Sequence, residues 1–255
     1  MQSTKTDEEN SSLQPVFLSD VELYFSQKVS EKKILIDGAE LHHIKYVMRH
    51  KSGDEIFVTD GKGQIYKTEL TVISTKDLTC RILQRMEYPN HFSGITFCVP
   101  RLKSPERFEF ALEKSVELGI TNFIVFESKR TIAKGEKLDR WQKVLTSAMK
   151  QSLRSWLPKI SYAKSLDGII KQNGTKILFD QNSDKTFQSI LNSQLTIGNC
   201  FFIFGPEGGF NKEELRITNG AYPDGGWELR IRLTENRLRS ETAIVTAASM
   251  LAMNV

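Results

Sequence analysis

From residue 93 onward the sequence alternates short apolar runs with helical segments, and this rhythm constrains the fold more than any other feature. The apolar runs have the length and the β-branched and aromatic content of strands. Strands that alternate with helices in this way form a mostly parallel sheet. The strands are expected at residues 95–100, 122–127, 159–163, 176–180, 199–204 and 227–233, and the helices at 105–118, 137–156 and 240–252. The sequence therefore predicts an α/β domain over residues 91–255.

Residues 15–90 follow a different pattern, in which short strands are bounded by turns that contain glycine and aspartate. The strands are expected at residues 33–36, 54–60, 64–73 and 78–84. A helix is expected over residues 39–50. Its apolar residues at helical spacing are Leu41, Ile44, Val47 and Met48. This stretch predicts a small β-barrel-like domain with one helix, and the boundary to the second domain is expected at Pro89-Asn90.

The start of the chain and its cysteines indicate the compartment. Residues 1–14 have neither the basic nor the apolar stretch of a signal peptide, and we expect them to form a disordered tail. No run approaches the ~20 apolar residues that cross a bilayer. Cys80, Cys98 and Cys200 form no C-x-x-C pair, so neither a disulfide framework nor a structural zinc site is expected. These features predict a cytoplasmic protein without a membrane partner.

All four histidines lie within the first 91 residues, which excludes several catalytic arrangements. No H-E-x-x-H zinc helix is present, and a Ser-His-Asp triad would need its histidine from the first third of the chain. The pair His42 and His43 is more typical of local structure than of metal binding. We therefore expect no metal, and a metal hydrolase is the least favoured class of enzyme.

The net charge of +4 is concentrated in one part of the chain. Residues 91–175 contain 15 Lys and Arg against 8 Asp and Glu, a net charge of +7, whereas the other segments carry between −2 and 0. In the helix expected at 137–156, cations recur on one face and apolar residues on another. Charged helix faces are usually only solvated. Here carboxylates do not balance the cations, which favours a surface for a polyanion such as RNA.

A glycine-rich loop, GPEGGFNKEEL at residues 205–215, follows the apolar strand FFIF and precedes a helix. Glycines let backbone N–H groups approach a ligand, and Asn211 and Glu214 have the spacing of a capping box. In α/β sheets ligands bind at this place, beyond the carboxyl end of a strand. The loop has neither the dinucleotide-binding nor the P-loop pattern. Two interpretations stay open: a ligand-binding loop, or a tight turn that needs glycines for its geometry alone.

A second junction of strand, loop and helix is LTENRLRSETA at residues 233–243. Ser240 is expected to be the helix N-cap, and Glu241 then falls in the first turn, where the helix dipole favours a carboxylate. The simpler interpretation is a capped helix with solvated arginines. The alternative is that Glu207, Arg239 and Glu241 converge on one ligand.

Several separate motifs resemble one known family. GPEGGF, the C-terminal LxxxxLR[ST]ETA pattern and the upstream KSPERFEFALEKSVELGI resemble the RsmE family, which are 16S rRNA uridine-N3 methyltransferases of the SPOUT superfamily. The stretch HHIKYVMRHKSGDEIFVTDGKG resembles the PUA-like domain of that family, and KQSLRSWLPKI resembles another of its segments. The similarity spans roughly residues 16–253, with the motifs in the expected order.

The resemblance implies a SPOUT methyltransferase domain with a trefoil-knotted, mostly parallel sheet, an N-terminal PUA-like β-barrel that binds RNA, and a homodimer. It implies S-adenosyl-L-methionine as the cofactor and 16S rRNA of the small ribosomal subunit as the partner. The residues implied to bind the cofactor are Leu178, Phe179, Asp180, Gly205, Pro206, Glu207, Gly208, Gly209, Leu233, Thr234, Asn236 and Leu238. Those implied to contact RNA are Arg49, Lys103, Arg107, Arg130, Arg140, Lys150 and Arg154. The chain departs from the family pattern at Thr234, where Gly is common, at Asn236, where Arg is common, and at Lys129 and Lys150, where Glu is common.

The reaction that the resemblance implies is methylation of a uridine at N3. This imide must lose its proton, and no histidine lies in the C-terminal half of the chain, so Glu241 is the candidate base. Arg239 is the candidate stabiliser of the charge on the uridine oxygens. Two alternatives stay open: a SPOUT methyltransferase that acts on another base or on a ribose 2′-OH of rRNA or tRNA, and a non-catalytic RNA-binding factor in ribosome assembly.

Overall fold

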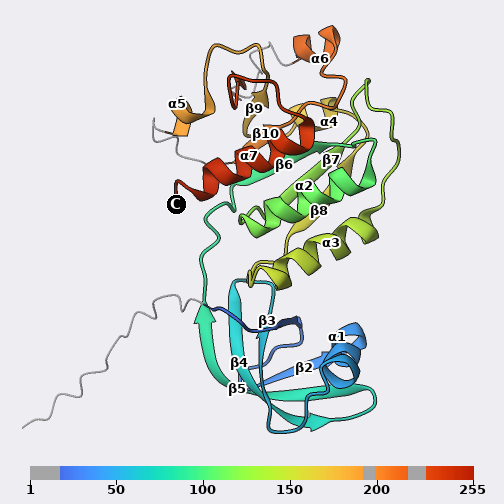
Figure 1. Ribbon diagram of the computed structural model, residues 1–255, viewed down its shortest axis with the longest axis vertical. Coiled ribbons are helices and arrows are strands. Elements are labelled where there is room, and N and C mark those ends of the chain that lie inside the picture. The colour runs from blue at the N-terminus through green and yellow to red at the C-terminus, as the bar shows by residue number, and fades with distance from the viewer. Residues whose placement is uncertain (1–17, 192–198, 218–227) are drawn as a thin grey trace, which may run out of the picture. The chain divides into compact units, whose positions relative to one another are not determined.

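The computed structural model describes residues 18–191, 199–217 and 228–255. The chain divides into two compact units, Met1–Pro89 and Asn90–Val255. Figure 1 shows a curled sheet with one helical segment in the first unit, and a sheet covered by helices in the second. The two units are described separately.

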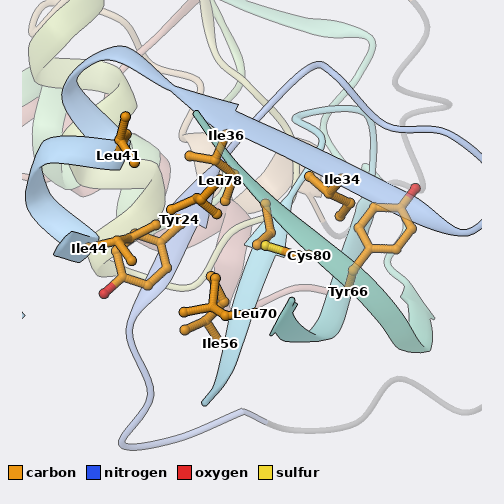
Figure 2. Close-up of a cluster of buried hydrophobic side chains, with 11 residues drawn as sticks. Tyr24, Ile34, Ile36, Leu41, Ile44, Ile56, Tyr66, Leu70, Leu78 and Cys80 are labelled. Carbon is orange, nitrogen blue, oxygen red and sulfur yellow. The ribbon is translucent and has the colours of Figure 1, made fainter. Parts of the chain in front are cut away.

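The first unit is a five-stranded sheet in the order β1-β3-β4-β5-β2. Its strands are β1 (Leu23–Phe25), β2 (Lys33–Asp37), β3 (Glu55–Thr59), β4 (Gln64–Ile73) and β5 (Asp77–Glu87). The neighbouring strands are antiparallel except for β1 and β3, which are parallel. The four strands expected from the sequence are confirmed, and the three-residue β1 was missed because it is too short to show a period. Side chains from β1 to β5 fill one apolar core (Figure 2).

The helix expected over residues 39–50 is only partly confirmed. An α-helical turn, α1 (Gly38–His42), continues into a π-helix, η1 (His43–Val47). The amide of Met48 donates to the carbonyl oxygen of His43 at 2.9 Å, five residues earlier, so the turn holds one residue more than an α-helical turn. Ile44 stays buried in the core, whereas the side chains of Val47 and Met48 face away from it. The spacing of Leu41, Ile44, Val47 and Met48 therefore predicted a regular α-helix, whereas the structure has a π-helical turn there.

The second unit contains a six-stranded sheet in the order β11-β9-β10-β6-β7-β8, and all of its described strand pairs are parallel. The predicted α/β fold with a parallel sheet is confirmed. The strands are β6 (Ile95–Pro100), β7 (Asn122–Phe126), β8 (Lys159–Ala163), β9 (Thr175–Phe179), β10 (Cys200–Ile203) and β11 (Glu228–Ile231). The helices are α2 (Pro105–Glu117), α3 (Leu138–Gln151), α4 (Asp167–Ile170), α5 (Phe187–Leu191), α6 (Lys212–Ile217) and α7 (Ser240–Ala252).

Both faces of this sheet are covered. Helix α2 packs against α3 and α7, and Figure 1 shows the three side by side over one face. Successive residues of a strand point to opposite faces. Cys98 of β6 packs with Ile169 and Ile170 of α4, whereas its neighbour Phe97 packs against the rings of Phe202 and Phe204. Burial on both faces explains why these strands read as continuous apolar runs.

The helix boundaries follow local signals in the sequence. Helix α2 begins after Ser104, whose Oγ accepts a hydrogen bond from the amide of Arg107 at 3.3 Å, and Pro105 occupies the first helical position. Helix α3 ends at Gln151, earlier than expected. Leu153 has a φ of +55°, which no α-helix accommodates.

Removal of the α2 cap gives a first test of this account. Ser104→Ala deletes the oxygen that accepts from Arg107, and we expect the free energy of unfolding to fall by about 1 kcal/mol. Urea denaturation of the two proteins measures the difference. Ser104→Asp supplies another acceptor and is expected to stay within ~0.5 kcal/mol of the natural chain. Equal losses in both variants would contradict the capping role.

Candidate active site

A cavity of about 810 Å³ opens beyond the carboxyl ends of β9, β10 and β11. Three loops and the first turn of α7 form its walls, together with one side chain each from α2 and α6. The lining residues are Arg107, Phe179, Asp180, Gln181, Asn182, Gly205, Pro206, Glu207, Gly209, Phe210, Leu215, Leu233, Arg237, Leu238, Arg239, Ser240, Glu241 and Ala243. This is the place at which open α/β sheets bind ligands.

Most of the residues that the sequence singled out meet at this cavity. Of the positions implied to hold a cofactor, those that line it are Phe179, Asp180, Gly205, Pro206, Glu207, Gly209, Leu233 and Leu238. Arg239 and Glu241 line it as well, so the alternative in which Glu207, Arg239 and Glu241 converge describes the geometry better than isolated solvated side chains.

Four of the implied cofactor positions lie elsewhere. Leu178 is fully buried and packs with Cys98 and Ile203, because β9 is an interior strand. Gly208 faces the side chain of Arg130 rather than the cavity. Thr234 and Asn236 are joined to each other, since the Thr234 hydroxyl donates to the Asn236 carbonyl at 2.7 Å. None of the four is among the lining residues.

Three hydrogen bonds from side chains to backbone carbonyls connect the loops with one another and with α7. The Gln181 amide donates to the carbonyl oxygens of Thr234 and Glu235 at 3.2 and 3.1 Å. The Ser240 hydroxyl donates to the Gly205 carbonyl at 2.6 Å. The N-cap predicted at Ser240 is wrong: the cap position is Arg239, and Ser240 lies in the first turn with its hydroxyl directed to Gly205. No local pattern of residues signals these contacts, because each joins residues at least 35 positions apart.

The glycine-rich loop is also fixed from its outer side. The predicted capping box is confirmed, since the Asn211 side chain accepts from the Glu214 amide and the Glu214 carboxylate accepts from the Asn211 amide. Glu214 is nearly buried and accepts a further bond from the Lys129 amide at 3.0 Å. The Arg130 guanidinium donates to the Gly208 carbonyl at 2.9 Å. The loop between β7 and α3 therefore supports the glycine-rich loop.

The charged groups inside the cavity are balanced in sign. Glu207 accepts a hydrogen bond from the backbone amide of Lys103 at 3.1 Å, so its carboxylate helps to position the loop. Glu241 is only 12% exposed, and its Oε1 lies 3.7 Å from Nε of Arg107. The side chain of Arg239 has no hydrogen-bond or ionic partner among the described residues, so its guanidinium is available to a ligand.

Two of the cations expected to bind RNA, Arg140 and Arg154, already have partners within the protein. The Arg140 guanidinium pairs with both carboxylate oxygens of Glu109, at 2.6 and 2.9 Å, and this hydrogen bonding raises the pKa of Arg140. Arg154 donates two bonds to the carbonyl of Glu117 at the end of α2, and burial lowers its pKa. The expectation that carboxylates leave this helix unbalanced is therefore wrong at Arg140, because its partner comes from the neighbouring helix α2.

The part of the chain that the structure describes has neither a membrane-spanning helix nor a metal-binding cluster. Within residues 18–191, 199–217 and 228–255, no helix is long and apolar enough to cross a membrane. In the same residues, no three His, Cys, Asp or Glu side chains gather where they could hold a metal ion. Cys80, Cys98 and Cys200 are free thiols and are buried.

Comparison with known proteins identifies the class. The model of a family described as RNA methyltransferase domain matches residues 90–252, and that of an RNA methyltransferase PUA domain matches residues 36–83. The chain therefore belongs to the RNA methyltransferase family. These matches also confirm the PUA-like domain expected at the N-terminus.

Its relatives within that family confirm the resemblance to RsmE. Ribosomal RNA small subunit methyltransferase E of Rickettsia conorii is 27% identical over 235 residues, which are 91% of this chain and 94% of the relative. The Bacillus subtilis protein of the same name is 26% identical over 247 residues, with the same coverage. The structure of the Neisseria gonorrhoeae protein of that name, bound to S-adenosyl methionine, is 25% identical with a TM-score of 0.74 and covers 91% of this chain and 97% of its own.

Adjacent glutamates in the glycine-rich loop provide a matched test of how this site is built. Glu214→Ala leaves the partly buried amides of Lys129 and Asn211 without the acceptor that the buried carboxylate supplies, and we expect the free energy of unfolding to fall by about 1–3 kcal/mol. Glu213→Ala removes an exposed pair with Lys129 and is expected to cost less than ~1 kcal/mol. Chemical denaturation of both variants measures the difference, and equal effects would show that the buried carboxylate does not hold the loop.

Proposed function

We propose that this protein transfers the methyl group of S-adenosyl-L-methionine to N3 of a uridine in 16S rRNA of the small ribosomal subunit. The observation that carries the proposal is the cavity at the carboxyl edge of the sheet, which brings Arg239 and Glu241 together with the three loops. Membership of the RNA methyltransferase family and the names of the relatives support it.

The residues present fit this cofactor. Phe179, Phe210, Leu233 and Leu238 offer apolar surface for an adenine ring, and Asp180 offers a carboxylate for ribose hydroxyls. A Cβ at Gly205 would lie 3.3 Å from the Phe210 ring, so glycine is needed where the loop approaches that ring closely. When bound, the cofactor supplies an electrophilic methyl group on a sulfonium.

Glu241 and Arg239 have complementary roles in the proposed reaction. The carboxylate of Glu241 accepts the proton of the uridine N3, and the guanidinium of Arg239 stabilises the negative charge that develops on the uridine oxygens. Arg107 lies beside Glu241, with its Nε 3.7 Å from Oε1 of that carboxylate, and helps to position it. Methyl transfer needs linear alignment, so the bonds from Gln181 and Ser240 contribute by fixing the loops relative to α7.

The RNA partner would approach over the basic part of the second unit. In a paired uridine N3 is hidden by its partner base, so the target must be unpaired or flipped out of its helix. Lys103, Arg107 and Arg130 are proposed phosphate contacts near the site, and Lys150 is a proposed contact in the last turn of α3. Arg140 and Arg154 would contribute through their exposed edges while they keep their internal partners. Arg49 would contact RNA from the first unit.

The proposal extends to assembly and topology. By the resemblance to RsmE proteins, the second unit forms a trefoil knot and the protein acts as a cytoplasmic homodimer. We propose that the chain divides into a tail at residues 1–14, a PUA-like RNA-binding domain at 15–90 and a methyltransferase domain at 91–255.

Primer extension on rRNA from a strain that lacks this gene tests the reaction. An N3-methyluridine stops reverse transcription, because the methyl group blocks the pairing edge of the base. We expect one such stop in 16S rRNA to disappear on deletion and to return when the gene is restored. A stop that persists in the deletion strain would refute the assignment, and mass analysis of the nucleoside separates N3 from another base position or a ribose 2′-OH.

Substitution of the two charged residues tests their roles. We expect Glu241→Gln to slow single-turnover methyl transfer by about 100- to 10,000-fold and Arg239→Ala by about 100- to 1,000-fold. Calorimetry should find cofactor binding retained in both variants. Thr242→Ala, in the same helical turn and outside the cavity lining, is the matched control and should keep its activity. Full activity of Glu241→Gln or Arg239→Ala would remove the role assigned to that residue.

A further inference from the structure

The π-helical turn of the first unit exposes apolar side chains that an α-helix would bury. Tyr46, Val47 and Met48 are 58, 55 and 40% exposed, although they follow directly after the fully buried Ile44. The extra residue in η1 turns Val47 and Met48 away from the core to which Leu41 and Ile44 contribute (Figure 2). Inserted π-turns are frequent at functional sites. We call Tyr46, Val47, Met48 and Arg49 the η1 surface.

The ring of Tyr46 is held in an open position. The imidazole of His42 lies 5.2 Å from it, measured between centroids, and the ammonium of Lys45 lies 5.3 Å from its centroid. Lys45 is itself anchored, because it donates to the Ser74 carbonyl at 3.0 Å. The Lys45 ammonium therefore lies over the ring, while Tyr46 as a whole stays more than half exposed and leaves the ring open to a ligand.

The segment that carries this surface has charged residues of one sign. Residues 41–53 include Lys45, Arg49 and Lys51 and no Asp or Glu. The nearest carboxylate downstream, Asp54, is already engaged by His50 and by the amide of Lys51. Arg49 has no ionic or hydrogen-bond partner among the described residues. An aromatic ring beside unpaired cations matches the chemistry of a single-stranded nucleic acid, which presents flat bases and phosphates.

We propose that the η1 surface binds an unpaired nucleotide of the substrate RNA. A base stacks on Tyr46, Val47 and Met48 contact the apolar faces of the base and sugar, and Arg49 contacts a phosphate. The inference rests on the proposed function in taking rRNA as the substrate, and it adds a stacking contact in the first unit to the phosphate contact assigned to Arg49. A docking face for protein is less favoured, because the patch is small and its rim offers cations alone.

Two variants separate stacking from charge. With small ribosomal subunits from the deletion strain as the probe, we expect Tyr46→Ala to weaken binding by about 5- to 100-fold with an unchanged salt dependence. Tyr46→Phe keeps the ring and should bind normally. Arg49→Ala should lower the slope of log affinity against log salt by about 1. Val72→Ser, at an exposed apolar position of β4 in the same unit, is the matched control and should bind normally.

The outcomes distinguish this inference from the proposed function. If the natural chain methylates the subunit and Tyr46→Ala binds it equally well, the inference is overturned and the function stands. If Tyr46→Ala weakens binding but no methylation of N3 is found, the inference stands and the proposed reaction falls. If Tyr46→Ala changes the sedimentation of the free protein and not its affinity for the subunit, the surface is a contact between copies of the chain, and the inference is wrong.

Discussion

Burial of the parallel sheet on both faces is the constraint on which the rest of the second unit depends. Because helices cover the two faces, ligands can reach the strands only at their ends, and the carboxyl ends of β9, β10 and β11 lie at one edge. Loops that are far apart in the sequence are thereby brought to one cavity. The sheet fixes the positions at which the loops start, and a small number of hydrogen bonds from side chains to backbone carbonyls fix the path of each loop.

The features that could be predicted from the sequence are those that depend on neighbouring residues. The interior strands β6, β7, β9 and β10 could be predicted because a strand buried on both faces is a nearly continuous apolar run, and α7 matches the segment expected at 240–252. The capping box of Asn211 and Glu214 could be predicted because it acts over three residues. Features of this kind can be predicted because they depend only on residues that are close together in the sequence.

Contacts between distant residues could not be read in the same way. The bond from Ser240 to Gly205 and the pairing of Arg140 with Glu109 depend on which elements become neighbours after folding. Ser240 therefore looked like a helix cap, and Arg140 looked unbalanced. The candidate residues of the cavity were found mainly through motifs of a known family. Leu178 entered that set because a motif identifies a segment without saying which of its side chains face the ligand.

The π-turn has a consequence for how this chain could change through evolution. Deletion of one residue from His43–Val47 would restore α-helical register and rotate Val47 and Met48 toward the core. Each side chain could then contribute about 1.5–3 kcal/mol through burial, where the core has room for it. A shorter chain would thus be more stable and would lack its outward-facing apolar patch. A chain that keeps the extra residue accepts lower stability in this small domain in exchange for the exposed side chains.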